Sequence, residues 1–226
     1  MKPTKFGSTL LETKDLTPTV FLLAFSVPDD FSFEPGQYVS IAIPVEGNVR
    51  RSYSIASGPD KKRRIELCIK RVEHGVGSNF LHGLKPGDSV EMLGPLGNFK
   101  IKDKSKDLIF IATGSGIAPF RSMIPTVKGK VILLSGVRYE DEVLFADEWT
   151  ALEKERDFKH HQIISRPRDP DYSGEKGHVQ QLFKHIPEGF NGHFYLCGLW
   201  LMIEESVKAL EEKGFRKEQI FYERYS

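Results

Sequence analysis

The feature that most constrains the fold is a change in the hydrophobic period near Asp107. Before this residue, the apolar runs are short or alternating and are separated by turns rich in Gly, Pro and Asp. These runs occupy residues 19–27, 37–43, 63–72 and 88–94. Short strands with frequent turn residues favour an antiparallel β-barrel. One helical piece, expected at residues 78–84 with Ser78 or Asn79 as its cap, interrupts this half.

After Asp107, strands and helices alternate. A continuous apolar run at 108–113 is typical of a strand covered on both faces. Further strands are expected at 131–137, 158–165, 192–197 and 219–223, with helical segments at 141–155, 178–185 and 202–214. This order predicts a parallel sheet with helices on both faces, a Rossmann-like α/β domain. The charged linker 100–107 marks the boundary, so we expect domains at 1–102 and 103–226.

Charge and cysteine content narrow the range of possible functions. The 32 basic and 31 acidic residues leave a net charge of +1, which gives no overall field that would attract nucleic acid or an acidic membrane. Two cysteines cannot supply the four thiolates of an iron–sulfur cluster or a Cys-rich zinc site, and we expect no metal. No run approaches the roughly 18 apolar residues of a membrane span. A cytoplasmic enzyme is the simplest interpretation.

Two glycine-rich segments have the chemistry of anion cradles. One follows the first strand of the α/β half and reads Thr113, Gly114, Ser115 and Gly116. Glycines allow a tight turn close to a pyrophosphate, and the following helix N-terminus attracts negative charge. The second, Gly75, Val76, Gly77 and Ser78, precedes the small helix of the barrel half. Each could also be a tight connection without a ligand, but a cradle in each half suits two dinucleotides that meet between domains.

A third segment, residues 51–57, combines a cation, a flat aromatic ring and several hydroxyl groups. Strand alternation puts Arg51 and Tyr53 on one face and Ser52 and Ser54 on the other. Arginine binds phosphate through its planar fork, and tyrosine stacks on flat heteroaromatic rings. An ordinary amphipathic strand would have the same pattern, and the segment alone leaves both alternatives open.

Together these segments resemble the ferredoxin–NADP reductase superfamily, from about Phe33 to the C-terminus. The similarity rests on five motifs in the family's order, RSYSIAS (51–57), GVGSNFLHGLKPGD (75–88), ATGSGIAPFRSM (112–123), CGLWLM (197–202) and ERY (223–225). The family fold is a Greek-key antiparallel flavin-binding barrel followed by a nucleotide-binding α/β domain. It therefore implies FAD as a bound cofactor and NADP(H) as a co-substrate, with NAD(H) as the alternative.

The resemblance assigns a role to each motif residue. Arg51 and Ser52 bind FAD, Tyr53 stacks on the isoalloxazine, and Ser54 lies near the flavin N5. Flavin-binding residues also include Cys68, Ile69, Lys70, Gly75, Val76, Gly77, Ser78 and Tyr225. The nicotinamide dinucleotide is bound by Thr113, Gly114, Ser115, Gly116, Cys197 and Gly198. Ser54, Cys197 and Glu223 are the implied catalytic residues. Cys197 could instead be a plain buried thiol, and Lys70 a solvated strand residue.

Residues after the third strand of the α/β half favour NADPH over NADH. A 2′-phosphate requires local positive charge and hydroxyl groups, whereas an NADH site usually places a carboxylate near the ribose. Ser165 and Arg166 end that strand and Lys176 follows, an arrangement similar to the family's 2′-phosphate clamp. The alternative is a solvated basic loop, which also contains Asp169 and Asp171.

The resulting hypothesis is a flavoprotein reductase that passes electrons from NADPH through FAD to ferredoxin, flavodoxin or a small acceptor. The segment 71–74 runs straight into Gly75 and lacks the hairpin that packs on the FAD adenine in plastid-type members. A reductase that uses flavin as a substrate is therefore one alternative. The other is a flavin-bearing electron-transfer subunit of a larger complex.

Overall fold

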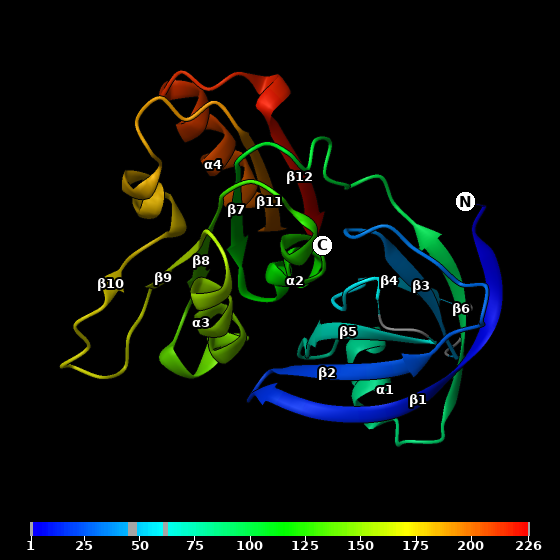
Figure 1. The fold of residues 1–226 in the computed structure, drawn as a ribbon. Helices are drawn as coiled ribbons and strands as arrows, with labels where there is room; N and C mark the ends of the chain where they lie inside the picture. Colours follow the sequence, from blue (N-terminus) through cyan, green and yellow to red (C-terminus); the bar gives the residue numbers. More distant parts are fainter. Residues whose placement is uncertain (1, 45–48, 61–62, 226) are drawn as a thin grey trace. The chain divides into compact units, whose positions relative to one another are not determined.

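The computed structural model describes residues 2–44, 49–60 and 63–225. Contacts between Cα atoms divide the chain into two compact units (Figure 1). The first unit comprises residues 1–101 and 118–125, and the second comprises residues 102–117 and 126–226. Helix α2 (Ala118–Met123) therefore packs with the first unit, although it follows the first strand of the second.

The first unit is built on a six-stranded antiparallel sheet with the order β4-β3-β6-β1-β2-β5. Its strands are β1 (Thr4–Thr17), β2 (Val20–Ser26), β3 (Tyr38–Ile43), β4 (Val49–Ser54), β5 (Arg64–Lys70) and β6 (Ser89–Leu96), with helix α1 (Val76–Gly83) between β5 and β6. A bridge between Ile55 and Leu67 joins the two outer strands, and Ala56 N donates to Glu66 O at 2.7 Å. These contacts curl the sheet into the expected barrel around an apolar core.

Strand β1 is the longest strand that hydrophobic periodicity did not predict. Of its fourteen residues only Ser8, Leu10 and Thr17 are buried, so no apolar alternation marks it. The strand is held instead by backbone pairing to β6 along its first half and to β2 along its second. Backbone hydrogen bonds leave no pattern in the sequence, which explains the omission.

The second unit contains a six-stranded parallel sheet with the order β10-β9-β8-β7-β11-β12 (Figure 1). Its strands are β7 (Leu108–Thr113), β8 (Val131–Val137), β9 (Phe158–Ile164), β10 (Glu175–Lys176), β11 (His193–Leu199) and β12 (Ile220–Tyr225). The α-helices are α3 (Ala146–Glu155) and α4 (Trp200–Glu212). Its short 3-10 helices are η1 (Gly114–Ile117), η3 (Glu140–Glu142), η4 (Val179–His185) and η5 (Lys217–Gln219), and η2 (Ile124–Thr126) follows α2 at the boundary between the two units.

Helices cover both faces of the parallel sheet, as predicted. Trp149 of α3 contacts the rings of Phe158 and His160 on one face of β9. Ile163 lies on the opposite face of that strand, in a core shared with η4 and α4. The predicted Rossmann-like arrangement is therefore correct. None of the described helices is long and apolar enough to cross a membrane.

Candidate functional site

In the first unit, the fold brings two of the sequence motifs together. A Cβ on Gly77 of α1 would lie 2.7 Å from Arg51 Cγ and 2.7 Å from Tyr53 Oη, both on β4. Arg51 and Tyr53 therefore share the face of β4 that meets α1, as strand alternation predicted. The close approach leaves no room for a side chain at Gly77, which is the reason that glycine is needed there.

Arg51 differs from its neighbour Arg50 in the contacts of its guanidinium group, and Tyr53 beside it is partly buried. Arg50 is bound to Glu91 at 2.7 Å and to Ser40, whereas Arg51 is exposed and donates to the Arg50 carbonyl. Among the described residues, no carboxylate pairs with Arg51, so its guanidinium is available for an anion. Burial raises the pKa of Tyr53 to about 12, partly offset by Arg51. The phenol therefore stays neutral and presents a flat apolar ring.

The glycine-rich turn before α1 is closed by side chains. Helix α1 begins at Val76 rather than Ser78, and its N-cap residue Gly75 makes no side-chain capping bond. Ser78 and Asn79 do not cap it, so the expected cap was wrong. Ser78 Oγ instead accepts from Val72 N at 3.0 Å, and Asn79 Nδ2 donates to Gly75 O at 2.8 Å. These bonds hold the turn in shape and leave the first-turn amides of α1 without helical partners.

The predicted flavin-binding residues of strand β5 differ in their exposure. Ile69 is 2% exposed and packs in the barrel core, so only its backbone is available to a ligand. Cys68 is also buried, whereas Lys70 at the strand end is exposed. Ser54 is buried at the end of β4, next to the bridge that joins this strand to β5. Ser52 is exposed on the face opposite Tyr53.

A buried ion pair that sequence analysis missed fastens α2 to the first unit. Arg121 Nη1 donates to Glu66 Oε2 at 2.7 Å, with side-chain exposures of 14% and 4%. Ser122 Oγ donates to the Ser57 carbonyl at 2.7 Å. Arg121 and Ser122 lie in the quoted motif ATGSGIAPFRSM, but no property of the motif identified their partners on β5 and after β4. They hold the helix that immediately follows η1.

In the second unit, the glycine-rich loop after β7 packs against the end of β11. A Cβ on Gly116 would lie 2.2 Å from the Cys197 carbonyl oxygen, and one on Gly198 would lie 2.5 Å from Thr113 Oγ1. The strand order reverses between β7 and β11, and such switch points are where open α/β sheets bind ligands. The two predicted nicotinamide motifs therefore meet at the switch point of this sheet.

This loop fits a bound dinucleotide. Thr113 Oγ1 is buried and has no hydrogen-bond partner among the described residues. Gly114 has φ +52°, and no atom lies within 4 Å of the position that a Cβ would take. Ser115 is partly exposed in the same turn. An orphaned buried hydroxyl beside open space is expected where a ligand completes the hydrogen bonding.

Cys197, Glu223 and Tyr225 lie close together at the C-terminal ends of β11 and β12. The parallel register aligns Cys197 with Glu223 and Leu199 with Tyr225. Complete burial, with a smaller contribution from Glu223, raises the pKa of the Cys197 thiol well above its usual value, and a hydrogen bond with Tyr225 partly offsets this. Cys197 is therefore a neutral thiol at physiological pH, and it lacks the thiolate needed for nucleophilic chemistry.

The predicted 2′-phosphate residues gather at the end of β9. Strand β10 pairs Lys176 with Ile164, which immediately precedes Ser165. Arg166 and Lys176 are exposed, and among the described residues neither forms an ion pair. Arg168 is different, because it pairs with Asp141 at 3.0 Å and covers the ring of Tyr139 at 3.8 Å. Arg166 and Lys176 thus have no carboxylate partner within the part of the chain that the structure describes, and Lys176 Nζ lies 5.8 Å from the centre of the Tyr172 ring.

Comparison with known proteins supports both halves. Residues 8–101 match the oxidoreductase FAD-binding domain, and residues 110–208 match the oxidoreductase NAD-binding domain. The chain is 35% identical over 241 positions to ferredoxin–NADP reductase B of Sorangium cellulosum (strain So ce56), covering 97% of each chain. It is 34% identical to DmpP, the reductase component of phenol 2-monooxygenase from Pseudomonas sp. (strain CF600), covering 93% of this chain and 63% of that one.

A solved structure gives the same result. The crystal structure of the Amycolatopsis cytochrome P450 reductase GcoB superposes with a TM-score of 0.90 and 27% identity, covering 98% of this chain and 70% of that one. The match to the Sorangium protein covers 97% of this chain and therefore extends over both halves. The chain therefore belongs to the ferredoxin–NADP reductase superfamily and is an NAD(P)H-dependent FAD oxidoreductase.

Proposed function

We propose that this reductase takes electrons from NADPH and passes them through bound FAD to a separate one-electron acceptor protein of the ferredoxin or flavodoxin type. The observation that carries the proposal is the match, over 97% of both chains, to a protein named ferredoxin–NADP reductase B. A small-molecule acceptor is the simpler variant of the same activity. We also propose that the boundary between the two domains lies between residues 102 and 103. The proposed location of the protein is the cytoplasm.

The proposed flavin site is the face shared by β4, β5 and α1. Arg51 binds the flavin phosphates with an unpaired guanidinium, and Tyr53 offers its neutral ring for stacking. The backbones of Ser52 and Ile69, with Ser54, Cys68 and Lys70, complete the strand contacts, and the diphosphate is held by Gly75, Val76, Gly77 and Ser78. Bound FAD supplies the capacity to accept two electrons from a nicotinamide and release them singly. The protein supplies positioning and electrostatics.

The proposed nicotinamide-dinucleotide site is the crossing of the β7 loop and the end of β11. Gly114, Ser115 and Gly116 bind the pyrophosphate through their amides, and the unpaired Thr113 hydroxyl donates to the ligand. Gly198 allows the end of β11 to approach Thr113 closely. Cys197 and Glu223 act at the nicotinamide, the thiol as a neutral group and the carboxylate as its charged neighbour. Tyr225 contributes to binding the flavin ring, and its hydrogen bond also holds the Cys197 thiol in position.

NADPH is preferred over NADH because two unpaired cations lie beside Ser165. Arg166 and Lys176 would bind a 2′-phosphate through charge-assisted hydrogen bonds, each contributing about 1.5–3 kcal/mol. NADH lacks that phosphate and gains nothing from these bonds. The preference therefore depends on Arg166 and Lys176 and not on the pyrophosphate loop.

Substitution of these cations tests the preference. We expect Arg166→Ala to raise the KM for NADPH at least about tenfold, corresponding to about 1.4 kcal/mol, with little change for NADH. Arg168→Ala is the matched control, since Arg168 is already paired with Asp141. Equal losses with both nicotinamides, or an equal effect of Arg168→Ala, would refute the assignment.

Two observations favour alternative functions. Only residues 71–75 separate the end of β5 from the start of α1, so this connection has no room for an adenine-packing hairpin. A reductase that releases flavin as a product is therefore the second candidate, and an FAD Kd far above the protein concentration would support it. The relative DmpP is a reductase component, which motivates the third candidate, a subunit of a larger complex. Dependence of turnover on a co-purifying partner would support that one.

A further inference from the structure

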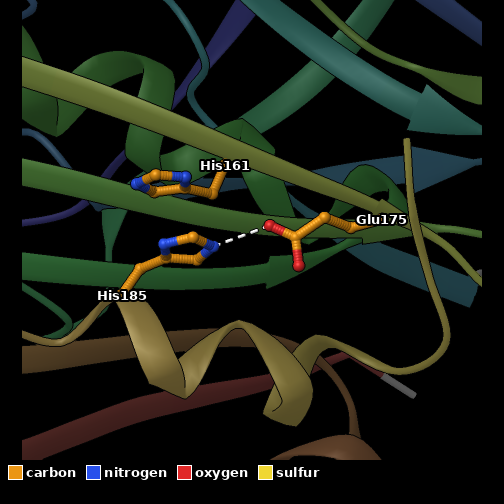
Figure 2. Close-up of side chains that lie close together, drawn as sticks. All are labelled: His161, Glu175 and His185. Carbon is orange, nitrogen blue, oxygen red and sulfur yellow. Dashed lines mark hydrogen bonds and ion pairs between the residues drawn. The ribbon is translucent and has the colours of Figure 1, made fainter. Parts of the chain in front are cut away.

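Next to the segment that carries Lys176, three potential metal ligands converge on one edge of the parallel sheet. They are His161 on β9, Glu175 on β10 and His185 at the end of η4 (Figure 2). Each offers one ligand atom, and these atoms all lie within 4.8 Å of one another. All three side chains are partly exposed, so an ion in solvent can reach them.

The local structure explains why the three side chains meet. Glu175 pairs with Ile163, so it lies on the same face of the sheet as His161, two residues before Ile163 on β9. Helix η4 packs on that face through Val179, Leu182 and Phe183, and its last residue is His185. The ligands thus come from three separate segments held by backbone pairing and core packing.

The three side chains already contact one another through a hydrogen bond and a ring stack. His185 Nε2 lies 2.6 Å from Glu175 Oε1, and the two imidazole rings stack at 3.7 Å with an interplanar angle of 7° (Figure 2). The other carboxylate oxygen of Glu175 accepts from Lys184 at 2.5 Å. The two stacked imidazoles thus place ring nitrogens close to one carboxylate oxygen of Glu175.

We propose that His161, Glu175 and His185 form a binding site for one divalent transition-metal ion of the Zn²⁺ type. Two imidazoles and a carboxylate are a ligand set that selects Zn²⁺ or Cu²⁺ over Mg²⁺ and Ca²⁺, which require oxygen ligands. Tetrahedral Zn²⁺ with bonds of about 2.0–2.1 Å needs ligand atoms about 3.3 Å apart. To bind one ion at that spacing, the two stacked rings would have to rotate about their side-chain torsions, while Lys184 keeps the second carboxylate oxygen.

Such an ion would fasten the segment between β9 and η4 to the sheet. Residues 165–178 connect the strand that carries His161 to the helix that carries His185, and Glu175 lies within them. A ligand that binds only the folded arrangement raises apparent stability by mass action. The ion would therefore stabilise this segment, which also contains Arg166 and Lys176. It would take no part in electron transfer itself.

Calorimetry with the FAD-loaded full chain, freed of metal by a chelator, tests the proposal. We expect one Zn²⁺ per chain with a micromolar or tighter Kd, a Zn²⁺-dependent rise in Tm of several degrees, and no response to Mg²⁺. His161→Gln, Glu175→Gln and His185→Gln should each weaken Zn²⁺ binding at least about tenfold. His178→Gln, an exposed histidine outside the trio, is the matched control and should bind as the unsubstituted chain does.

Electron paramagnetic resonance of the unsubstituted chain with one equivalent of Cu²⁺ provides a second measurement that needs no variant. Splitting from two imidazole nitrogens is expected, and it should disappear in the His161→Gln, His185→Gln double variant. Equal Zn²⁺ affinity of the unsubstituted chain and the double variant would overturn the proposal. A Cu²⁺ spectrum with oxygen ligands alone would also overturn it.

Discussion

The buried carboxylate of Glu66 should be the largest single electrostatic contribution to the stability of the first unit. Its side chain is 4% exposed and lies 2.7 Å from Arg121 and 3.3 Å from Arg64. Glu66→Gln keeps the shape of the side chain and removes its charge. The Arg121 guanidinium, only 14% exposed, would then lose the carboxylate that lies 2.7 Å from it.

The size of the effect follows from this burial. Removing one partner of a buried ion pair costs about 3–5 kcal/mol, because the other charge stays desolvated. A loss of about 4 kcal/mol lowers the urea midpoint by about 2 M when m is about 2 kcal/mol/M. Since α2 follows η1 directly, we also expect weaker NADPH binding in Glu66→Gln.

Urea unfolding followed by far-ultraviolet circular dichroism measures this loss. Glu12→Gln is the control, because Glu12 also pairs with Arg64 at 2.7 Å but is 65% exposed, so its removal should cost no more than about 1 kcal/mol. A double variant, Glu66→Leu with Arg121→Met, should be more stable than Glu66→Gln, because it removes both charges of the buried pair and not only one of them. A midpoint for Glu66→Gln no lower than that of Glu12→Gln would refute the reasoning.

Three further substitutions test separate parts of the structure. Gly77→Ala should raise the FAD Kd about tenfold (about 1.4 kcal/mol) in a flavin-fluorescence titration, because the new methyl group meets Arg51 at Cγ and Tyr53 at its hydroxyl oxygen and displaces both side chains; unchanged affinity would contradict the packing. Gly116→Ala should weaken NADPH binding at least about tenfold while FAD content stays normal, because the methyl group meets the Cys197 backbone at 2.2 Å; normal NADPH binding would contradict this. Burial lowers the pKa of His160 to about 4. The unfolded chain takes up this proton near pH 6.5 and the folded chain does not, so stability falls as pH drops from 6.5 towards 4. We expect His160→Gln to lose about 2 kcal/mol less than the unsubstituted chain between pH 7.5 and pH 5 in urea unfolding, and equal losses would contradict the shift.

Sequence patterns predicted the elements that bury apolar faces. The runs at 108–113 and 131–137 coincide with β7 and β8, because central parallel strands are apolar throughout. The acidic segment 141–155 is divided into η3 and α3, with Phe145 between them in the left-handed conformation at φ +59°. Strand β10 has two residues, too few for any period to be visible.

The candidate site was predictable wherever glycine or alternation marks it. Arg51 and Tyr53 were expected on one face, and a single strand is enough to derive this. The partner of Arg121 on β5 was not, since that contact depends on where α2 packs. The trio His161, Glu175 and His185 was missed for the same reason, because its members are far apart in sequence and meet only through sheet pairing and helix packing.

Anaerobic titration of the purified protein with NADPH and then with NADH tests the central claim most directly. We predict yellow protein whose bound FAD is bleached by about one equivalent of NADPH, and by NADH only at higher concentration. Colourless protein that does not take up added FAD would contradict the account, and so would bound FAD that neither nicotinamide bleaches.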